Sequence, residues 1–397
     1  MKSSNKGLVF AAALGLTCLS ASGAAQELEH SSTAAPSTPL PAGLAPWEVG
    51  LPLPIAAAPF APPAGSVLTP AEYARNKGIL LAWEGFDTIL RAITVAITTN
   101  DPTAIVTILV DNPSEQSSAT SFLSAGGADL SQVAFLVAPS NSVWIRDYGP
   151  RFILEDKQLA MVDHTYNRPR PQDDAIPSAV ATAWSVTKYD IPLVHGGGNF
   201  HLFQDGDAFM TDLVLDENPG LSTLDIQTYY ALYQNLDVTI FPGFPTSFDS
   251  TQHIDMWMLP VRDKVVIIGE YSAASGAPHT ITEDAVTELT GRGYTVFRTP
   301  AWGGTFQTHF TYTNAVIFNK LVLVPQYSGR PTENAQAISI YQQAFPGKQI
   351  LGVDGSQIVS SAGVFHCIVM HVPDATWIFE DDFETGDASV WSAVTAP

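Results

Sequence analysis

Strand-like apolar runs alternate with helix-like runs along most of this 397-residue chain. The strand-like runs include AIVTILV, KVVIIGEY, LVLVPQY and CIVMHV. Between them we expect one helix capped by Thr282 and closed by Gly291, and another capped by Thr332 and closed by Gly347. This alternation predicts an α/β architecture, and an apolar fraction of 46% is enough for a large core.

The N-terminus carries the pattern of an export signal. Lys2 and Lys6 precede an apolar segment from Leu8 to Leu19, and small residues follow up to Ala25. We therefore predict a signal peptide at residues 1–25 and a secreted or periplasmic mature protein. No later segment is long and apolar enough to cross a bilayer, so no membrane insertion is expected.

Composition divides the rest of the chain into three parts. Residues 26–65 are rich in Ala, Pro and Ser, which predicts an extended linker or pro-segment. The main domain is expected at residues 66–378, opening with a helix whose cap is Thr69 and whose capping box is completed by Glu72. Residues 379–397 are acidic and rich in small residues, which predicts a flexible tail.

The formal charge of −21 restricts the partners of the protein. Nucleic acid is not expected, because the chain offers no basic footprint. A cationic substrate would be attracted by such a field. Alternatively, the acidity serves only to keep an exported protein soluble.

Removal of the signal peptide, which contains Cys18, leaves Cys367 as the one cysteine of the mature chain. No internal disulfide is then possible. A lone thiol is either a small buried apolar side chain or a nucleophile with histidine and carboxylate partners elsewhere in the chain. The cysteine taken alone does not decide between them.

Four short segments place polar residues in apolar surroundings. They contain Trp144 and Asp147, then His253 and Asp255, then Asn314, and finally Cys367. If TQHIDMWMLP is a strand, His253 and Asp255 share one face, as a base and its carboxylate partner would. An aspartate before a turn, such as Asp147, often serves only to bond the backbone.

In this order the segments resemble the guanidino-group modifying enzymes of the pentein fold, above all the agmatine deiminases and the bacterial peptidylarginine deiminases. The resemblance runs from about Ala71 to about Val372 and is strongest in WIRDYGP, GGGNF, HIDMW, the TN before LVLVPQY and the segment ending at Cys367. It implies a five-bladed, pseudo-symmetric α/β propeller of ββαβ modules with the site in its central channel. No cofactor and no metal are expected.

The chemistry of a guanidinium explains these residue types. Carboxylates hold this planar cation best, which suits Asp147 and Asp255. The Cys367 thiolate would attack its central carbon, and His253 would serve as general acid and then base. The resemblance implies that Asn314 lines the site and that Trp144 walls the guanidinium channel.

Two neighbouring features receive structural interpretations. His366 adjoins Cys367, and strand neighbours point to opposite faces, so we interpret it as a structural histidine rather than the base. The glycines at 196–198 form either a backbone anion nest or a tight turn before a strand.

The substrate is suggested by Arg168 and Arg170, which flank Pro169. Two such arginines suit a carboxylate clamp, and in the bacterial peptidylarginine deiminases, which resemble this chain here, paired arginines hold the carboxylate of a C-terminal arginine. Alternatively, they are surface residues neutralised by Asp173 and Asp174. We predict a secreted hydrolase that converts arginine in peptides or proteins, with C-terminal arginine favoured, to citrulline.

Three alternatives stay open at this point. An agmatine deiminase would use the same machinery on a small guanidine. A secreted cysteine peptidase would also use Cys and His, but would need an oxyanion hole rather than two carboxylates facing a cation. A non-catalytic binder of cationic peptides would have no use for a reactive thiol. The oligomeric state is not determined by these patterns.

Overall fold

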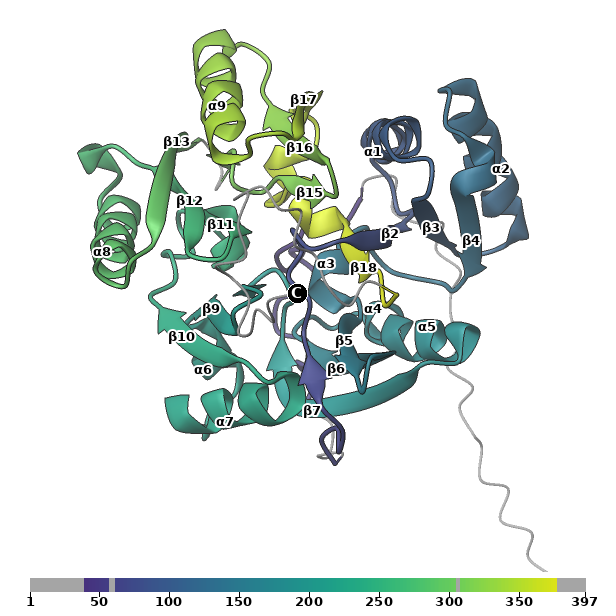
Figure 1. Cartoon of the computed structure of the whole chain (residues 1–397), viewed down its shortest axis with the longest axis horizontal. Coiled ribbons are helices and arrows are strands. Elements are labelled where there is room, and N and C mark those ends of the chain that lie inside the picture. Colours follow the sequence, from purple (N-terminus) through teal and green to yellow (C-terminus); the bar gives the residue numbers. More distant parts are fainter. Residues whose placement is uncertain (1–38, 57–60, 305–307, 377–397) are drawn as a thin grey trace, which may run out of the picture. The chain divides into compact units, whose positions relative to one another are not determined.

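A computed structural model describes residues 39–56, 61–304 and 308–376. The expected signal peptide and acidic tail lie outside the described residues. The described residues belong to one compact unit, in which their strands make five sheets arranged around a common centre (Figure 1). None of the described helices is long and apolar enough to span a membrane.

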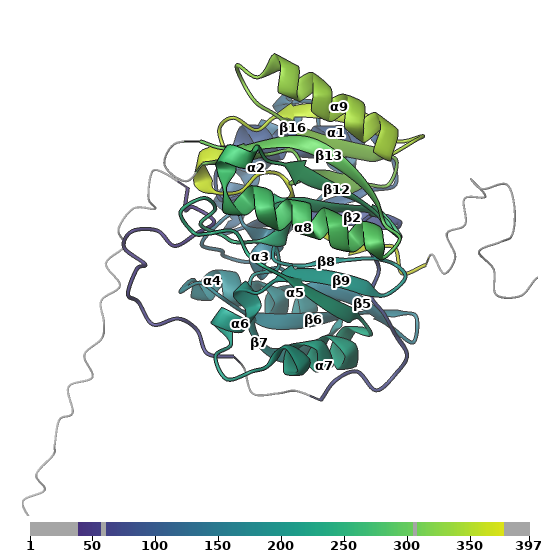
Figure 2. The same cartoon turned by 90° about the vertical axis from the view of Figure 1, so that its left-hand side faces the viewer.

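Each sheet is built on the same strand motif. Two antiparallel strands are followed by helical structure and then by a strand that runs parallel to the second strand of the pair. The helices α1, α2, α5, α7, α8 and α9 lie on the outside of the ring (Figure 1), and Figure 2 shows α8 covering the outer face of β12 and β13. The inner ends of the strands and the loops between them are thereby left facing the centre.

Two of the five sheets lie early in the chain. The first contains β1 (Val67–Leu68), β5 (Arg151–Glu155), β6 (Gln158–Tyr166) and β7 (Thr187–His195), with α3 (Ile145–Tyr148), α4 (Pro171–Asp174) and α5 (Ile176–Trp184) beside it. The second contains β8 (His201–Leu202), β9 (Asp207–Thr211) and β10 (Asp237–Phe241), with α6 (Leu213–Glu217) and α7 (Thr223–Gln234).

Two further sheets follow in chain order. One contains β11 (Met258–Arg262), β12 (Val265–Glu270), β13 (Thr295–Gly303) and β14 (His309–Thr311), with η2 (Ile254–Met256), η3 (Ala273–Ser275) and α8 (Ala277–Gly291). The other contains β15 (Val316–Phe318), β16 (Leu321–Gln326) and β17 (Gln349–Asp354), with α9 (Pro331–Ala344), η4 (Val359–Ser361) and η5 (His366–Ile368).

The last sheet joins the two ends of the domain. Strand β18 (Met370–Pro373) pairs antiparallel with β2 (Asn76–Ala82), so that Met370 lies opposite Leu80. Parallel strands β3 (Ile105–Val110) and β4 (Val133–Val137) complete it, with α1 (Asp87–Asn100), α2 (Pro113–Ala125) and η1 (Leu130–Gln132). This pairing closes the ring and fixes η5, which immediately precedes β18, at its centre.

Apolar patterning explains why these elements form. Helix α1 buries Ile89, Leu90, Ile93 and Ile97, which recur at helical spacing on one face. Strand β3 is buried along almost its whole length, as expected for a central parallel strand. The α/β architecture expected from the sequence is therefore confirmed.

The expected helix at Thr69 is wrong. No helix starts there, and the next element is β2, which begins at Asn76. The Thr69 hydroxyl donates instead to the Gln234 carbonyl (2.6 Å), and the Glu72 side chain turns toward Arg146 and His366. Tertiary partners of these two side chains thus outweigh a local capping signal.

The other two expected helices exist with shifted starts. Helix α8 ends at Gly291 as expected but begins at Ala277, and Thr282 lies inside it with its hydroxyl bonded to the Pro278 carbonyl (2.9 Å). Helix α9 begins at Pro331, one residue before the expected cap Thr332. A proline lies in the first turn of both helices, where its missing N–H costs nothing.

Residues 39–50, which we call the N-terminal strap, belong to the segment expected to be an extended linker or pro-segment. They do not behave as a free linker, because Ala42 and Ala45 are fully buried. The Ala42 amide donates to the Ser361 carbonyl (2.9 Å). This part of the chain therefore packs on the domain despite having no periodic apolar face.

Candidate active site

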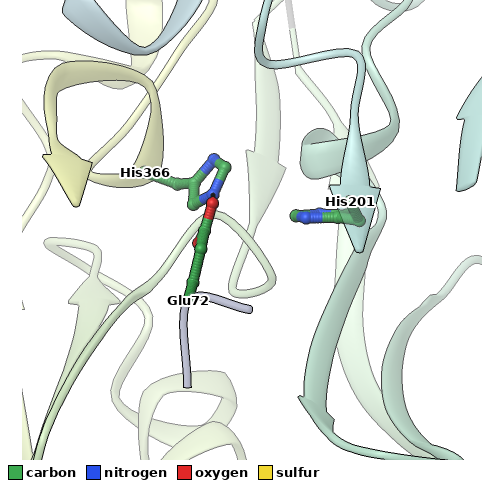
Figure 3. A group of neighbouring side chains, drawn as sticks. All are labelled: Glu72, His201 and His366. Atoms are coloured by element: carbon green, nitrogen blue, oxygen red, sulfur yellow. Dashed lines mark hydrogen bonds and ion pairs between the residues drawn. The ribbon is translucent and has the colours of Figure 1, made fainter. Parts of the chain in front are cut away.

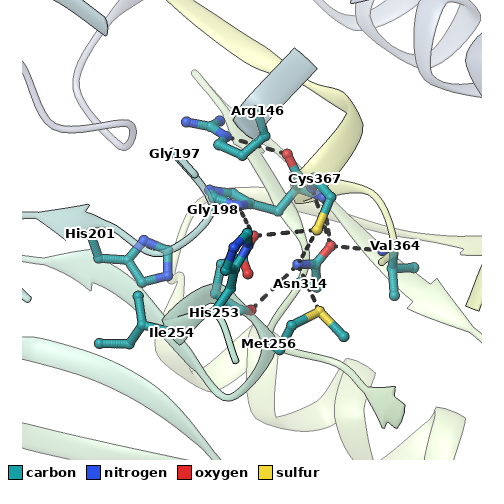
Figure 4. Close-up of polar contacts among 12 residues, drawn as sticks. Arg146, Gly197, Gly198, His201, His253, Ile254, Met256, Asn314, Val364 and Cys367 are labelled. Atoms are coloured by element: carbon teal, nitrogen blue, oxygen red, sulfur yellow. Dashed lines mark hydrogen bonds and ion pairs between the residues drawn. The ribbon is translucent and has the colours of Figure 1, made fainter. Parts of the chain in front are cut away.

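The residues singled out in the sequence contact one another, and Figure 4 shows His253, Asn314 and Cys367 of this group side by side. Asp147 comes from α3, His253 and Asp255 from the start of η2, Asn314 from the loop between β14 and β15, and Cys367 from η5. All of these side chains are at most 1% exposed. The fold thus brings together five polar residues that span more than half of the chain.

Two local expectations about this group are wrong. His253 and Asp255 do not lie on a strand, since His253 is extended and Asp255 belongs to the 3₁₀ turn that follows. Cys367 also lies in a 3₁₀ turn, η5, and the strand begins only at Met370. Strand alternation therefore does not separate His366 from Cys367, and both of them contact Asp255.

Asn314 holds the thiol in place. Its side-chain oxygen accepts from the backbone amides of Val364 (3.2 Å), His366 (3.0 Å) and Cys367 (3.4 Å). Its Nδ2 donates to Cys367 Sγ at 3.1 Å, as Figure 4 shows. This amide both shapes the loop of the cysteine and offers a donor that would stabilise a thiolate.

The thiol itself lies beside negative charge. Its Sγ is 3.4 Å from Oδ2 of Asp255. Burial raises the pKa of Cys367, and the carboxylates of Asp255 and Asp147 raise it further, to well above its usual value. The resting thiol is therefore protonated at neutral pH, and a cation placed between the two carboxylates would favour the thiolate.

This electrostatic setting predicts how Cys367 alkylation depends on pH. A neutral haloacetamide should react slowly at pH 7 and faster as the pH rises, because the pKa is raised and only the thiolate reacts. A cationic haloacetamidine should react faster at pH 7, because it offsets the carboxylates. Rates are measured by mass spectrometry from pH 6 to 10.

The Asp255→Asn variant is the control for that experiment, because it removes one of the charges while keeping the shape of the side chain. We expect the advantage of the cationic reagent to shrink in this variant. Equal rates for the two reagents at pH 7 in the unmodified protein would contradict the electrostatic account of the thiol.

His253 and Asp147 form a buried pair. His253 Nδ1 lies 3.4 Å from Asp147 Oδ1, which also accepts from the Gly198 amide (3.0 Å). Burial lowers the pKa of His253, but the Asp147 carboxylate outweighs it and the net shift is upward. The imidazole is therefore easily protonated, which suits a general acid.

Gly198 permits this close pairing. A Cβ at this position would lie 2.6 Å from Asp147 Oδ1 and 2.7 Å from His253 Nδ1. The Gly197 amide also donates to the Asp147 backbone carbonyl (2.8 Å). The glycine-rich turn thus gives close approach to Asp147, with the Gly198 amide bound to its carboxylate and the Gly197 amide to its backbone carbonyl, rather than an anion nest for a ligand.

Behind Asp255 lies a chain of buried charges. His366 donates through Nδ1 to Asp255 Oδ2 (2.8 Å), and its Nε2 contacts Glu72 Oε2 (2.9 Å). Burial and Arg146 lower the pKa of His366, but the two carboxylates give a net upward shift. His366 has partners on both ring nitrogens, as expected for a structural histidine, yet it also fixes a residue of the site.

Glu72, His201 and His366 lie close enough for a metal ion, with ligand atoms within 4.8 Å of one another (Figure 3). The contacts favour a polar network instead. Arg146 donates to Glu72 (2.6 Å) and places a positive charge there, while His201 Nε2 bonds the Met258 carbonyl (2.9 Å). A cation would have to displace these partners.

Some polar atoms of the site make no hydrogen bond among the described residues. They include Asp255 Oδ1, both ring nitrogens of His253 and, further out, Glu217 Oε2 and Arg170 Nη1. Buried polar atoms are almost always paired, so this cluster of unpaired atoms is consistent with a site that binds water or a ligand. A free carboxylate oxygen beside Cys367 is what a guanidinium N–H donor requires.

Trp144 precedes α3 and is fully buried. A Cβ at Gly363 would lie 2.5 Å from its ring, so the ring packs on the loop that leads to Cys367. Its Nε1 donates to the carbonyl of Leu40 in the strap (2.8 Å). The tryptophan therefore lies between the cysteine loop and the strap.

Arg168 and Arg170 are buried, so the alternative of a surface pair is wrong. Arg170 pairs with Glu48, with Nε 2.8 Å from Oε1 and Nη2 2.9 Å from Oε2. Arg168 donates to the Ala42 carbonyl (3.1 Å), and its charge helps lower the pKa of Asp147 below the usual value against the effect of burial. Arg168 thus lies close to Asp147 and His253, and Arg170 holds a carboxylate.

Three acidic residues of this region were missed in the sequence. Glu72 was assigned to a capping box, Glu48 to a linker, and Glu217 was not noticed. Burial raises the pKa of Glu217 to about 7, while the charges of Arg168 and His253 oppose the rise. Nothing in the local sequence marks these residues, because their partners are distant in the chain.

Comparison with known proteins agrees with the chemistry that the geometry of the site suggests. A family profile described as Porphyromonas-type peptidyl-arginine deiminase matches residues 68–373. The chain belongs to this family. The deiminase is a hydrolase of guanidino C–N bonds, and the peptidase and the non-catalytic binder are set aside.

Relatives and solved structures agree with this assignment. The deiminase is 27% identical to a "Putative agmatine deiminase" of Lactococcus lactis, over 61% of this chain and 78% of the relative. It is 26% identical to one of Legionella pneumophila strain Paris, over 68% and 82%. The structure of a "Putative Arginine Deiminase from Porphyromonas gingivalis" superposes with a TM-score of 0.68 at 21% identity, over 78% of this chain and 99% of that one. Agmatine deiminase of Enterococcus faecalis gives 0.66 at 22% identity, over 78% and 96%. The expected pentein fold is confirmed.

Proposed function

We propose that this deiminase acts outside the cytoplasm on arginine in peptides or proteins, preferring C-terminal arginine, and releases citrulline and ammonia. The observation that carries the proposal is the two-point pairing of the buried Arg170 with a carboxylate. The substrate would place its guanidinium between Asp147 and Asp255 and its terminal carboxylate toward Arg168 and Arg170.

In the first step, the bound cation offsets the two carboxylates and lowers the pKa of the Cys367 thiol, which loses its proton to water. The thiolate adds to the central guanidinium carbon, forming a C–S bond and a tetrahedral adduct. His253 in its protonated form donates a proton to one nitrogen, the C–N bond breaks, and ammonia leaves. A covalent thiouronium stays on Cys367, and His253 is left neutral.

In the second step, neutral His253 takes a proton from water, which adds to the thiouronium carbon. The C–S bond then breaks, the hydroxyl proton of the adduct passes to the leaving sulfur and restores the thiol, and the carbon keeps the new oxygen as the ureido group of citrulline. Asn314 Nδ2 supports the departing thiolate through its hydrogen bond to Sγ. The proton on His253 is available for the next turnover.

Charge favours a substrate with a carboxylate at its far end. Agmatine carries a second positive charge on its amine, and Arg168 is close enough to influence both Asp147 and His253. Two buried arginines would repel that amine and attract a carboxylate. At the outer part of the site, these charges favour binding of a C-terminal arginine over binding of agmatine.

Deimination of the agmatine guanidinium is the second candidate, and two observations favour it. The relatives described above carry the name agmatine deiminase. In addition, Glu217 accepts a hydrogen bond from Asn167 through Oε1, while its Oε2 makes no hydrogen bond to any described residue. Ionised Glu217 would offer a partner for the amine of agmatine.

The Arg168→Ala/Arg170→Ala variant tests the substrate class. We expect it to raise KM for a C-terminal-arginine peptide and to remove the preference for the free acid over the C-terminal amide. Each lost hydrogen bond to a charged group costs about 1.5–3 kcal/mol. The measurement is kcat/KM for the acid, the amide and agmatine on both proteins.

Glu217→Gln is the matched control. It should leave the ratio between acid and amide unchanged, and it should lower activity on agmatine if that amine uses Glu217. A protein that shows no preference for the free acid, or that turns over agmatine better than both peptides, would replace the peptidyl proposal with agmatine deamination.

A further inference from the structure

The N-terminal strap is bound by the same residues that we assign to the substrate. Trp144 Nε1 donates to the Leu40 carbonyl (2.8 Å) and Arg168 Nε to the Ala42 carbonyl (3.1 Å). Arg170 Nη2 donates to the carbonyls of Pro41 and Gly43 (both 2.9 Å). Three buried side chains thus hold the backbone of a peptide.

The strap crosses loops from several sheets. The Ala42 amide bonds Ser361, which follows β17. A Cβ on Gly43 would lie 3.0 Å from Ser250 Oγ, in the loop after β10, and a Cβ on Gly85, after β2, would lie 2.5 Å from Pro39. Residues 39–43 therefore lie across loops from different parts of the ring, next to Trp144.

The strap also supplies a carboxylate. Glu48 is 5% exposed, its Oε2 accepts from the Ala45 amide (2.7 Å), and its own amide donates to the Ala45 carbonyl (2.9 Å). This turn directs the carboxylate at Arg170. Burial raises the pKa of Glu48, but Arg170 outweighs it and the net shift is downward, so Glu48 is ionised.

We propose that Trp144, Arg168, Arg170 and Ser361 form a peptide-binding subsite, and that residues 40–48 of the same chain are its resident ligand. Glu48 takes the place of the substrate carboxylate on Arg170, so strap and substrate bind in competition. This inference rests on the proposed use of Arg170 as the carboxylate partner. The strap must leave before a C-terminal-arginine peptide can bind.

Burial of the catalytic group agrees with such competition. Cys367, His253, Asp147 and Asp255 are at most 1% exposed while the strap is in place. The strap backbone and Glu48 together use Arg168 Nε and the Nε and Nη2 groups of Arg170. A substrate needs these same donors and must displace the strap to reach them. The free energy of displacing the strap weakens the apparent binding of the substrate and therefore raises KM.

The test uses the full chain with Glu48→Gln, which keeps the shape of the side chain and removes its charge, and Glu48→Ala. The control is Val49→Ala, since Val49 is 69% exposed beside it. We measure KM for a C-terminal-arginine peptide, the rate of Cys367 alkylation by a haloacetamidine, and the thermal unfolding midpoint. Both Glu48 variants should lower KM and speed alkylation on the order of tenfold, with the control unchanged.

The outcomes separate this inference from the proposed function. Faster alkylation and a lower KM in the Glu48 variants, together with a preference for the free acid over the amide, support both. Faster alkylation without any preference for the free acid would support the strap as a barrier to Cys367. It would reject the proposal that Arg170 binds the substrate carboxylate. Unchanged KM and alkylation, or lost activity with a lower unfolding midpoint, would show that the strap is only structural and overturn the inference.

Discussion

Replacement of Cys367 by alanine or serine is expected to abolish turnover while leaving the fold intact. In the proposed mechanism the thiol forms the covalent bond on which both half-reactions depend, and no other described side chain of the site is a thiol. Removing a nucleophile lowers kcat on the order of 10⁴-fold or more. Ammonia release and the thermal unfolding midpoint are measured together.

Cys18→Ser in the full chain with its N-terminal segment retained is the matched control for this experiment, because it changes the other cysteine of the chain and should leave turnover unchanged. Mass spectrometry of the unmodified deiminase, quenched during turnover, should show an adduct on Cys367. Substantial ammonia release by the alanine variant would contradict the covalent mechanism.

The second large effect is expected from Asp147→Asn and Asp255→Asn. Each amide keeps the shape of the carboxylate but lacks its charge, and its NH₂ group would face the donors of the guanidinium. Losing one partner of a desolvated charge pair costs about 2–5 kcal/mol. We therefore expect kcat/KM to fall on the order of 30-fold to several thousand-fold in each variant.

The two variants should differ in detail. Asp147 also pairs with His253 and holds its pKa up, so Asp147→Asn should move the acidic or basic limb of the pH–rate profile that reports His253. Because Asp147 helps to raise the pKa of His253, removing its charge should lower that pKa and move the limb to lower pH. Asp284→Asn on the exposed face of α8 is the control, and near-normal kinetics in both site variants would show that the guanidinium binds elsewhere.

Much of the site could be predicted from the sequence because reaction chemistry restricts residue types. A guanidine hydrolase needs carboxylates, a nucleophile and an acid–base group, and the segments with Asp147, His253, Asp255, Asn314 and Cys367 supply them in apolar surroundings. The structure brings these five together. The alternation of strand-like and helix-like apolar runs likewise predicted the α/β class, because the periodicity of apolar residues can be recognised within short segments of the sequence.

Local patterns failed where a side chain has a distant partner. Thr69 and Glu72 look like a capping box, yet Glu72 binds His366, 294 residues away in the chain. His253 and Asp255 alternate like strand residues, yet η2 forms there instead. In both places tertiary contacts stabilise a conformation that short-range propensity does not favour.

The sequence by itself therefore determined the fold class and the reaction type, and it predicted the catalytic residues, which the structure brings together. Only the tertiary structure decided that β18 closes the ring against β2, that His366 joins Asp255 to Glu72, and that Glu48 occupies Arg170. The physical reason is that these contacts are long-range pairings of buried charges and strand edges. Their free energy exists only after the chain has folded, so no segment of the sequence carries a signal for them.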